Sequence, residues 1–242
     1  MSSPVLATPH ASGERFAAHV AATRAALERA ERMDAALAAL AAHRYAEATA
    51  ALAALVDEDP ADGTARVNLG YVRLLCGDFA RGWDTFEAFR ETPGVRAAYA
   101  SLAGVPRWDG CPFPGRRLAI AREAGFGDLL QFARFFPLVK ARGGTVIVEC
   151  AAELAALVAT LAGVDEVQVS AGIALAATRV DYVLPLMSVP GTLGIGADGI
   201  GMPAPYIAAD GARAAEFTRT LGLRTSELNV GCTRTPLLAK TV

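Results

Sequence analysis

Apolar residues recur at helical spacing in the first part of the chain and then change to short continuous runs. From about residue 14 to 42 the candidate buried positions are Phe16, Val20, Leu27, Met33, Ala36, Leu37 and Leu40. Further helices are predicted over 44–60, 64–76 and 80–91, and Pro93 ends this part. The pattern predicts an α-helical region followed by an α/β region.

The α/β region is predicted from apolar runs that alternate with helical stretches after residue 116. Strands are expected over 118–121, 145–150, 166–169 and 181–186, and a short extended piece over 205–207. Helices are expected over about 128–138, 152–161 and 211–221. This alternation predicts a mostly parallel, Rossmann-like sheet with right-handed crossovers. Because ligands bind beyond the carboxyl ends of such strands, 125–128 and 186–188 are expected at one crevice.

A glycine turn, Glu123-Ala124-Gly125-Phe126-Gly127, separates the first predicted strand from a helix that Asp128 is expected to open. The glycines suggest backbone angles that other residues avoid. A dinucleotide fingerprint would need a third glycine where Leu130 stands, so NAD and FAD are not predicted, and neither is any other cofactor. Asp128 is either a helix cap or a carboxylate that accepts a proton from a sugar hydroxyl, and the two roles are compatible.

Composition excludes several classes of function. The chain has 242 residues and a net charge of −2, which argues against a nucleic-acid surface. No apolar run reaches the roughly 18 residues of a membrane span, and the N-terminus lacks the features of a signal peptide, so a cytoplasmic protein is expected. The four cysteines show neither metal-ligand spacing nor a disulfide framework. All three histidines precede residue 44, far from the glycine turn, so no metal site and no catalytic triad are predicted.

The predicted organisation has five parts. Residues 1–12 are expected to be disordered, 13–93 to be helical, and 94–116 to form a turn-rich connector in which Trp108 plugs the junction. Residues 117–223 form the α/β domain, and 224–242 form an irregular tail.

The helical region contains a repeat. His43-Arg44-Tyr45 and Gly77-Asp78-Phe79 lie 34 positions apart, between paired helices in both cases. Leu69, Gly70, Phe79, Phe86 and Phe89 fit the packing positions of a second unit. The spacing and these residues resemble the tetratricopeptide repeat. The resemblance implies a surface that binds a protein partner, and the alternative is a structural appendage that docks on the next domain.

A second resemblance covers most of the chain. The segments W-D-G (108–110), R-E-A-G-F-G-D-L-L-Q-F-A-R (122–134), G-V-D-E-V (163–167), P-L-M-S (185–188) and P-A-P-Y-I (203–207) follow one another. In this order they resemble bacterial tetratricopeptide proteins fused to a heptosyltransferase-like glycosyltransferase of the GT-B type. The resemblance implies two Rossmann-like halves, of which the N-terminal one faces the acceptor. It makes Asp128 the candidate base and places Glu123, Gly125, Gly127, Gln131 and Ser188 in the substrate cleft.

The end of the chain departs from that family. After Leu223 the family continues into a nucleotide-sugar domain, whereas 224–242 has no βα pattern and suggests a truncation. We therefore expect an acceptor-side half that cannot transfer sugar alone and that meets a nucleotide sugar only if a donor domain is supplied. The alternatives are a non-catalytic scaffold for protein–protein interaction and a fragment without an independent function.

Overall fold

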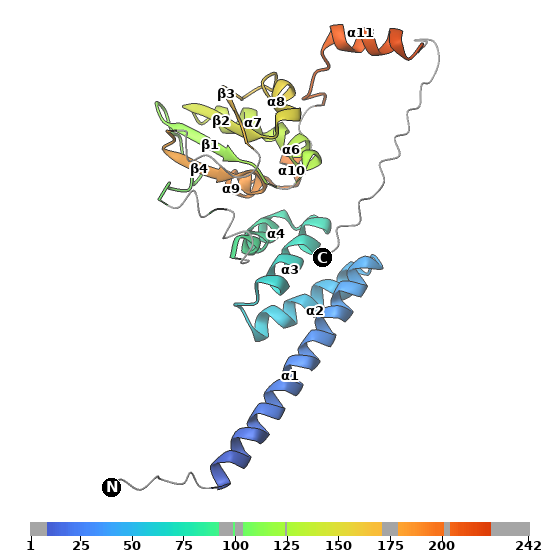
Figure 1. Cartoon of the computed structure of the whole chain (residues 1–242), viewed down its shortest axis with the longest axis vertical. Helices are drawn as coiled ribbons and strands as arrows, with labels where there is room; N and C mark the ends of the chain where they lie inside the picture. Colours follow the sequence, from blue (N-terminus) through green and yellow to red (C-terminus); the bar gives the residue numbers. More distant parts are fainter. Residues whose placement is uncertain are drawn as a thin grey trace, which may run out of the picture. The chain divides into compact units, whose positions relative to one another are not determined.

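A computed structural model of the chain describes residues 9–91, 99, 104–123, 125–170, 179–200 and 204–223 (Figure 1). Its internal contacts separate one compact unit, up to residue 203, from a second that begins at Ala204. The predicted tail, residues 224–242, and most of the first half of the predicted connector lie outside the described residues. The domain boundaries proposed above stay predictions.

The first unit begins with helices in hairpin order. They are α1 (Pro9–Ala41), α2 (Tyr45–Glu58), α3 (Gly63–Leu75) and α4 (Phe79–Phe86), followed by the 3-10 helix η1 (Glu87–Glu91). Each helix packs on the next one along the chain. Tyr45 and Phe79, which begin α2 and α4, are 34 positions apart, so the hairpins do recur at the predicted spacing. That they are tetratricopeptide repeats stays a prediction.

Helix α1 differs from the prediction at its N-terminal end. It already begins at Pro9, so residues 9–12 are helical rather than disordered, and residues 1–8 lie outside the described part. Phe16 and Leu27, predicted to be buried, are 71% and 62% exposed, and Val20 is exposed as well. The reason is length, because α2 has 14 residues and α1 has 33. At about 1.5 Å per residue, α2 can cover less than half of α1.

Local chemistry explains where the hairpins turn and how closely they pack. Asp62 and Asp78 are the N-cap residues of α3 and α4, and their side chains accept hydrogen bonds from Ala65 N (2.9 Å) and Arg81 N (3.4 Å). A Cβ added at Gly70 would lie 2.6 Å from Cα of Phe86. The absence of a side chain at Gly70 therefore lets α3 and α4 approach closely.

The sheet has four parallel strands in the order β3-β2-β1-β4. They are β1 (Arg117–Ala121), β2 (Thr145–Cys150), β3 (Glu166–Val169) and β4 (Tyr182–Pro185). Every residue of β1, β2 and β4 after the first is buried, as expected for apolar runs in a parallel sheet. The predicted all-α part followed by a parallel sheet is thus confirmed, whereas the GT-B assignment stays a prediction.

Short helices connect β1 to β2 and β2 to β3, and others follow β4. They are α6 (Phe126–Phe132), η3 (Ala133–Phe135), α7 (Phe136–Lys140), α8 (Ala152–Val158), η5 (Leu186–Ser188), α9 (Val189–Thr192) and α10 (Ala197–Ile200). The single helix predicted over 128–138 is therefore three short pieces, and Pro137 stands at the start of the last one. Trp108, predicted to plug the junction, is 2% exposed, so its burial is confirmed.

In the second unit, α11 (Gly211–Thr220) starts after the N-cap Asp210, whose side chain accepts from Arg213 N at 2.9 Å. Residues 205–207, predicted to be extended, belong to no strand of the sheet. Within the described ranges, none of the helices combines the length and the apolar character that crossing a membrane requires.

Candidate functional site

The strand order places a crevice between the carboxyl ends of β1 and β4. The chain runs outward from β1 through β2 to β3 and then returns to β4 on the other side of β1. In α/β sheets, ligands bind beyond the carboxyl ends of the strands at the point where the strand order reverses. The glycine turn follows β1, and Leu186–Ser188 follows β4. Both predicted segments therefore lie at this switch point.

The glycine turn has ordinary backbone angles, contrary to prediction. Gly125 is extended, with φ −97° and ψ −177°, and Gly127 is absent from the described glycines with positive φ. The backbone conformation at these two positions therefore does not require glycine. A Cβ added at Gly127 would meet no atom within 4 Å. The space beside Gly127 is open, which suits a segment that a ligand approaches.

Asp128 lies in the first turn of α6 but does not open it. The helix begins at Phe126, so Gly125 is the N-cap and Asp128 the third helical residue. Its Oδ2 accepts a hydrogen bond from Gly125 N at 2.8 Å, which is the reciprocal half of a capping box. The other carboxylate oxygen has no hydrogen bond within the described part of the chain. The structural role of Asp128 therefore leaves one oxygen for a ligand.

A pocket of about 470 Å³ lies beside Asp128, and we call it the aromatic pocket. It is lined by Tyr71, Leu74, Leu75, Phe79, Trp83 and Phe86 from the α3–α4 hairpin, by Asp128, Gln131, Phe132, Arg134 and Phe135, and by Met187 and Ile200. Six of these side chains are aromatic, and Asp128 supplies a carboxylate. An apolar wall with a few polar groups is typical of pockets that bind small molecules. The helical region thus supplies about half of the wall of a pocket at the switch point.

Arg90 of η1 reaches the other side of the crevice. Its Nη2 donates to Ser188 Oγ at 3.0 Å, and its Nε donates to Glu87 Oε2 at 2.6 Å. Arg107 also pairs with Glu87, at 2.9 Å. Ser188 is completely buried, so this hydroxyl serves the contact between η1 and the sheet region and does not line the aromatic pocket.

Glu123 is the buried carboxylate of the crevice. It is 8% exposed, and its Oε2 accepts from Met187 N at 2.8 Å. Burial raises the pKa of Glu123, although the Tyr99 hydroxyl, the Met187 amide and the Arg90 charge act in the opposite direction. Burial, and after it the Glu123 charge, likewise raises the pKa of Tyr99. Glu123 therefore bridges the ends of β1 and β4, and burial there disfavours its charged form.

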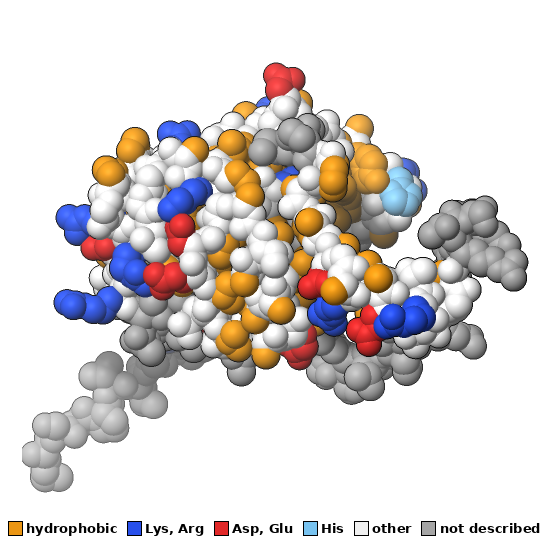
Figure 2. Space-filling model, turned by 90° about the horizontal axis from the view of Figure 1, so that it is seen from above, with side chains coloured by type: hydrophobic (Ala, Val, Ile, Leu, Met, Phe, Trp, Pro, Cys, Tyr) orange, Lys and Arg blue, Asp and Glu red, His pale blue; other side chains and the backbone are white. Residues whose placement is uncertain are grey.

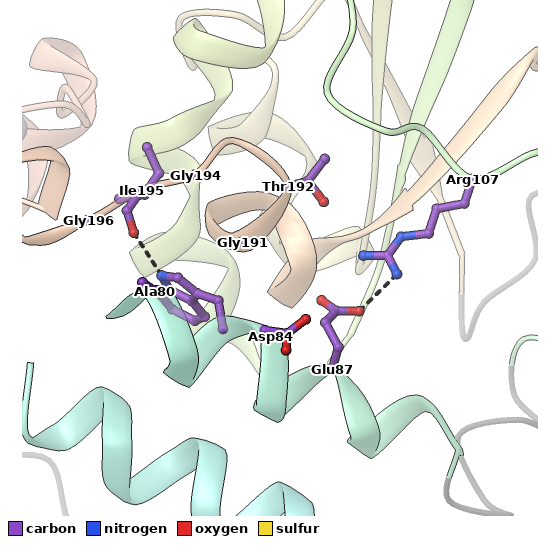
Figure 3. A pocket seen from close by; sticks show the side chains of 10 residues that line it. Ala80, Asp84, Glu87, Arg107, Gly191, Thr192, Gly194, Ile195 and Gly196 are labelled. Carbon is purple, nitrogen blue, oxygen red and sulfur yellow. Dashed lines mark hydrogen bonds and ion pairs between the residues drawn. The ribbon is translucent and has the colours of Figure 1, made fainter. Parts of the chain in front are cut away.

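Trp83 holds the helical hairpin against the loop after β4. Its Nε1 donates to the Ile195 carbonyl at 2.9 Å, and its ring stacks near Phe79 and meets Phe132 edge-on. A second pocket, of about 490 Å³, lies on the neighbouring face of α4 (Figure 3). Figure 3 shows Asp84 and Glu87 beneath α9, with Arg107 extending toward Glu87. Trp83 lines both pockets and so forms the wall between them.

The structure divides four of the six predicted site residues into two groups, and Gly125 and Gly127 do not line the pocket. Asp128 and Gln131 lie together in the aromatic pocket, whereas Glu123 and Ser188 lie in the buried contacts beside it. Met187 joins the two groups, since it lines the pocket and donates its amide to Glu123. The sequence did not indicate Trp83, Arg90 or Tyr99 as site residues. Their partners are distant in sequence, and no local pattern signals such contacts.

The described residues contain no cluster suited to a metal ion. No group of three or more His, Cys, Asp or Glu side chains in the described ranges could hold a metal ion. On the face shown in Figure 2, acidic and basic side chains are interspersed among apolar ones. This mixture agrees with the small net charge of −2.

Comparisons with protein-family profiles, with characterised proteins and with solved structures give no match to this chain. The resemblances inferred from the sequence therefore stay predictions, and a function has to be argued from the site.

We expect Glu123→Gln to make the protein more stable at neutral pH. The raised pKa means that ionising Glu123 costs more in the folded than in the unfolded state. This penalty is absent below the unfolded pKa, near 4.3, and grows as the pH rises toward the folded pKa. Gln stays neutral, and its amide oxygen can still accept from Met187 N.

The measurement is urea denaturation of both proteins from pH 4.5 to 8. The stability difference between variant and wild type should increase with pH and then level off. All other titrating groups are common to both proteins and cancel. A difference that does not change with pH would contradict the prediction.

Proposed function

We propose that the first unit is the acceptor-binding half of a glycosyltransferase-like protein and that the aromatic pocket binds the sugar acceptor. One observation carries the proposal: the carboxylate after the glycine turn, Asp128, stands in an aromatic-walled pocket at the switch point of a parallel sheet. Aromatic rings offer the apolar faces on which sugar rings stack. Asp128 and Gln131 offer partners for hydroxyl groups.

In the proposed reaction, an acceptor hydroxyl attacks the anomeric carbon of a nucleotide sugar. The new bond joins that carbon to the acceptor oxygen, the bond to the diphosphate oxygen breaks, and the nucleoside diphosphate leaves. The hydroxyl proton passes to the free oxygen of Asp128. The described residues form a single parallel sheet, so the proposal assigns nucleotide-sugar binding to a donor half outside them and requires no metal or other cofactor.

The proposal is tested by saturation-transfer NMR with methyl glycosides of hexoses and heptoses. At least one glycoside should bind the wild-type protein. Tyr71→Ala, which removes a half-exposed ring from the pocket wall, should weaken binding by about tenfold. Asp128→Ala should weaken binding similarly, because it removes the carboxylate that accepts a hydrogen bond from the ligand hydroxyl.

Phe217→Ala is the matched control. This side chain is also an exposed aromatic, at 58%, but it belongs to α11. It should leave binding unchanged. Absence of binding by every glycoside, or normal binding by both pocket variants, would overturn the proposal.

The second candidate is a helical scaffold that binds a protein. Tyr71 and Leu75 favour it, because these large apolar side chains on α3 are about half exposed. In that case the aromatic pocket receives an apolar side chain of the partner, and no glycoside binds. Leu75→Ala, together with Tyr71→Ala, would then abolish capture of the partner without changing stability.

A further inference from the structure

The second pocket, which lies between α4 and the segment that contains α9, has no role in the proposed function. Four of its residues come from the helical region, and their helical spacing places them on one side of it: Ala80, Trp83, Asp84 and Glu87. Arg107 reaches the pocket from the segment before β1 (Figure 3). The pocket's volume of about 490 Å³ is in the usual range for sites that bind small molecules. It is therefore large enough for a ligand of its own.

Three charged side chains line this pocket, and they form a negative end and a positive end. Asp84 is exposed and has no hydrogen bond or ion pair within the described part of the chain. Glu87, by contrast, accepts from Arg90 Nε at 2.6 Å and pairs with Arg107 at 2.9 Å. Two guanidinium groups around one carboxylate leave a surplus positive charge there. Because Asp84 lies three residues before Glu87, the two ends are about one helical turn apart.

Apart from Thr192, the remaining wall is apolar or glycine. Trp83 Nε1 already donates to the Ile195 carbonyl at 2.9 Å, so the indole offers its ring surface and no free N–H group. A Cβ added at Gly194 or Gly196 would meet no atom within 4 Å, so space is open beside these two glycines. The pocket thus combines a charged end of each sign with an apolar surface.

We propose that this pocket binds an α-amino acid with an apolar side chain. The ammonium group of the ligand donates to Asp84, and its carboxylate accepts from the N–H groups of Arg107 that do not face Glu87. The side chain of the ligand packs on the ring of Trp83. The inference goes beyond the proposed function, because neither Asp84 nor Arg107 lines the aromatic pocket.

The charges of the pocket select a zwitterion. A simple amine leaves the surplus guanidinium charge without a partner, and a phosphate is repelled by the Asp84 carboxylate. A neutral sugar would cover both charges and neutralise neither, which costs solvation free energy. In an α-amino acid the opposite charges are attached to the same carbon, so one small ligand can reach both ends of the pocket.

The test is saturation-transfer NMR on the full chain with leucine, valine, methionine and phenylalanine as free amino acids. At least one of them should bind. Its N-acetyl derivative and its amide each lack one charge and should bind about tenfold more weakly or worse. Tryptophan fluorescence locates the ligand: the chain has two tryptophans, and Trp108 is 2% exposed, so a change in emission on binding reports Trp83.

Asp84→Asn and Arg107→Gln each remove one charge from the pocket. Each variant should weaken binding of the free amino acid by about tenfold or more. Asp57→Asn and Arg44→Gln are the matched controls. Asp57 is an exposed helical carboxylate without a partner in the described residues, and Arg44 is an exposed guanidinium that pairs with Glu47 at 2.9 Å. Both controls should bind normally, and melting temperatures show whether all four variants are folded.

The outcomes are separate from those of the glycoside experiment. Binding that needs both charges of the ligand, together with Asp84 and Arg107, supports the amino-acid site. Absence of binding by all four amino acids overturns it, and so does unchanged binding in either pocket variant. Equal binding of the amine that lacks the carboxylate also overturns it, because Arg107 then has no role. None of these results changes the case for the aromatic pocket.

Discussion

Trp108→Ala is expected to lower the free energy of unfolding by about 3–5 kcal/mol, the usual cost of removing a large aromatic side chain from a core. Trp108 is 2% exposed, and its ring meets Phe113 edge-on at 5.4 Å. Its Nε1 donates to the Cys111 carbonyl at 2.8 Å, and its backbone amide donates to Val183 of β4 at 3.0 Å. The indole thus holds the segment before β1 against the sheet.

Urea denaturation followed by circular dichroism measures this loss. Trp108→Phe is the control, because it keeps a buried ring and loses the donor to Cys111. Its cost should be clearly smaller than that of alanine. An alanine variant within about 1 kcal/mol of the wild type would show that Trp108 is not a core residue, since full burial of such a side chain contributes more than that.

Gly70→Ala should destabilise the α3–α4 hairpin by about 1–3 kcal/mol, the typical cost of overpacking. The added methyl would lie 2.6 Å from Cα of Phe86, and backbone cannot move aside as a flexible side chain can. Gly63→Ala is the control in the same helix. Its methyl would meet only the Ala88 carbonyl, at 4.0 Å.

Thermal unfolding should therefore separate the two variants. Gly63→Ala should melt at or above the wild-type temperature, because alanine favours helix more than glycine does. Gly70→Ala should melt lower although Gly70, in the middle of α3, offers the larger gain in helix propensity. Equal melting temperatures for the two variants would contradict the close approach of α3 and α4.

The strands could be predicted from the sequence because their signals are local. Apolar runs located β2 and β3 to the residue, and β1 and β4 to within one residue at each end. Asp128 was expected to open its helix, but it is the third residue of α6. From the sequence, either Gly125 or Asp128 could be the N-cap residue. Only the backbone geometry shows that it is Gly125.

Contacts between distant segments could not be predicted in this way. Trp83 bonds to Ile195 and Arg90 to Ser188, across 112 and 98 positions of the chain. The helical periodicity places Trp83 on a buried face, but it does not show which segment covers that face. The exposed Phe16 and Leu27 illustrate the same limit, because apolar spacing predicts a buried face without showing whether a partner reaches it.

The position of β4 beside β1 also determines the order in which the sheet can be assembled. While the chain is being synthesised, β1 can pair with β2 as soon as residue 150 has emerged, whereas its other neighbour, β4, starts only at Tyr182. Until then one edge of β1 exposes unpaired amides and carbonyls, and such edges are prone to wrong pairing. The edge of β1 is therefore open to wrong pairing for as long as β4 has not been synthesised.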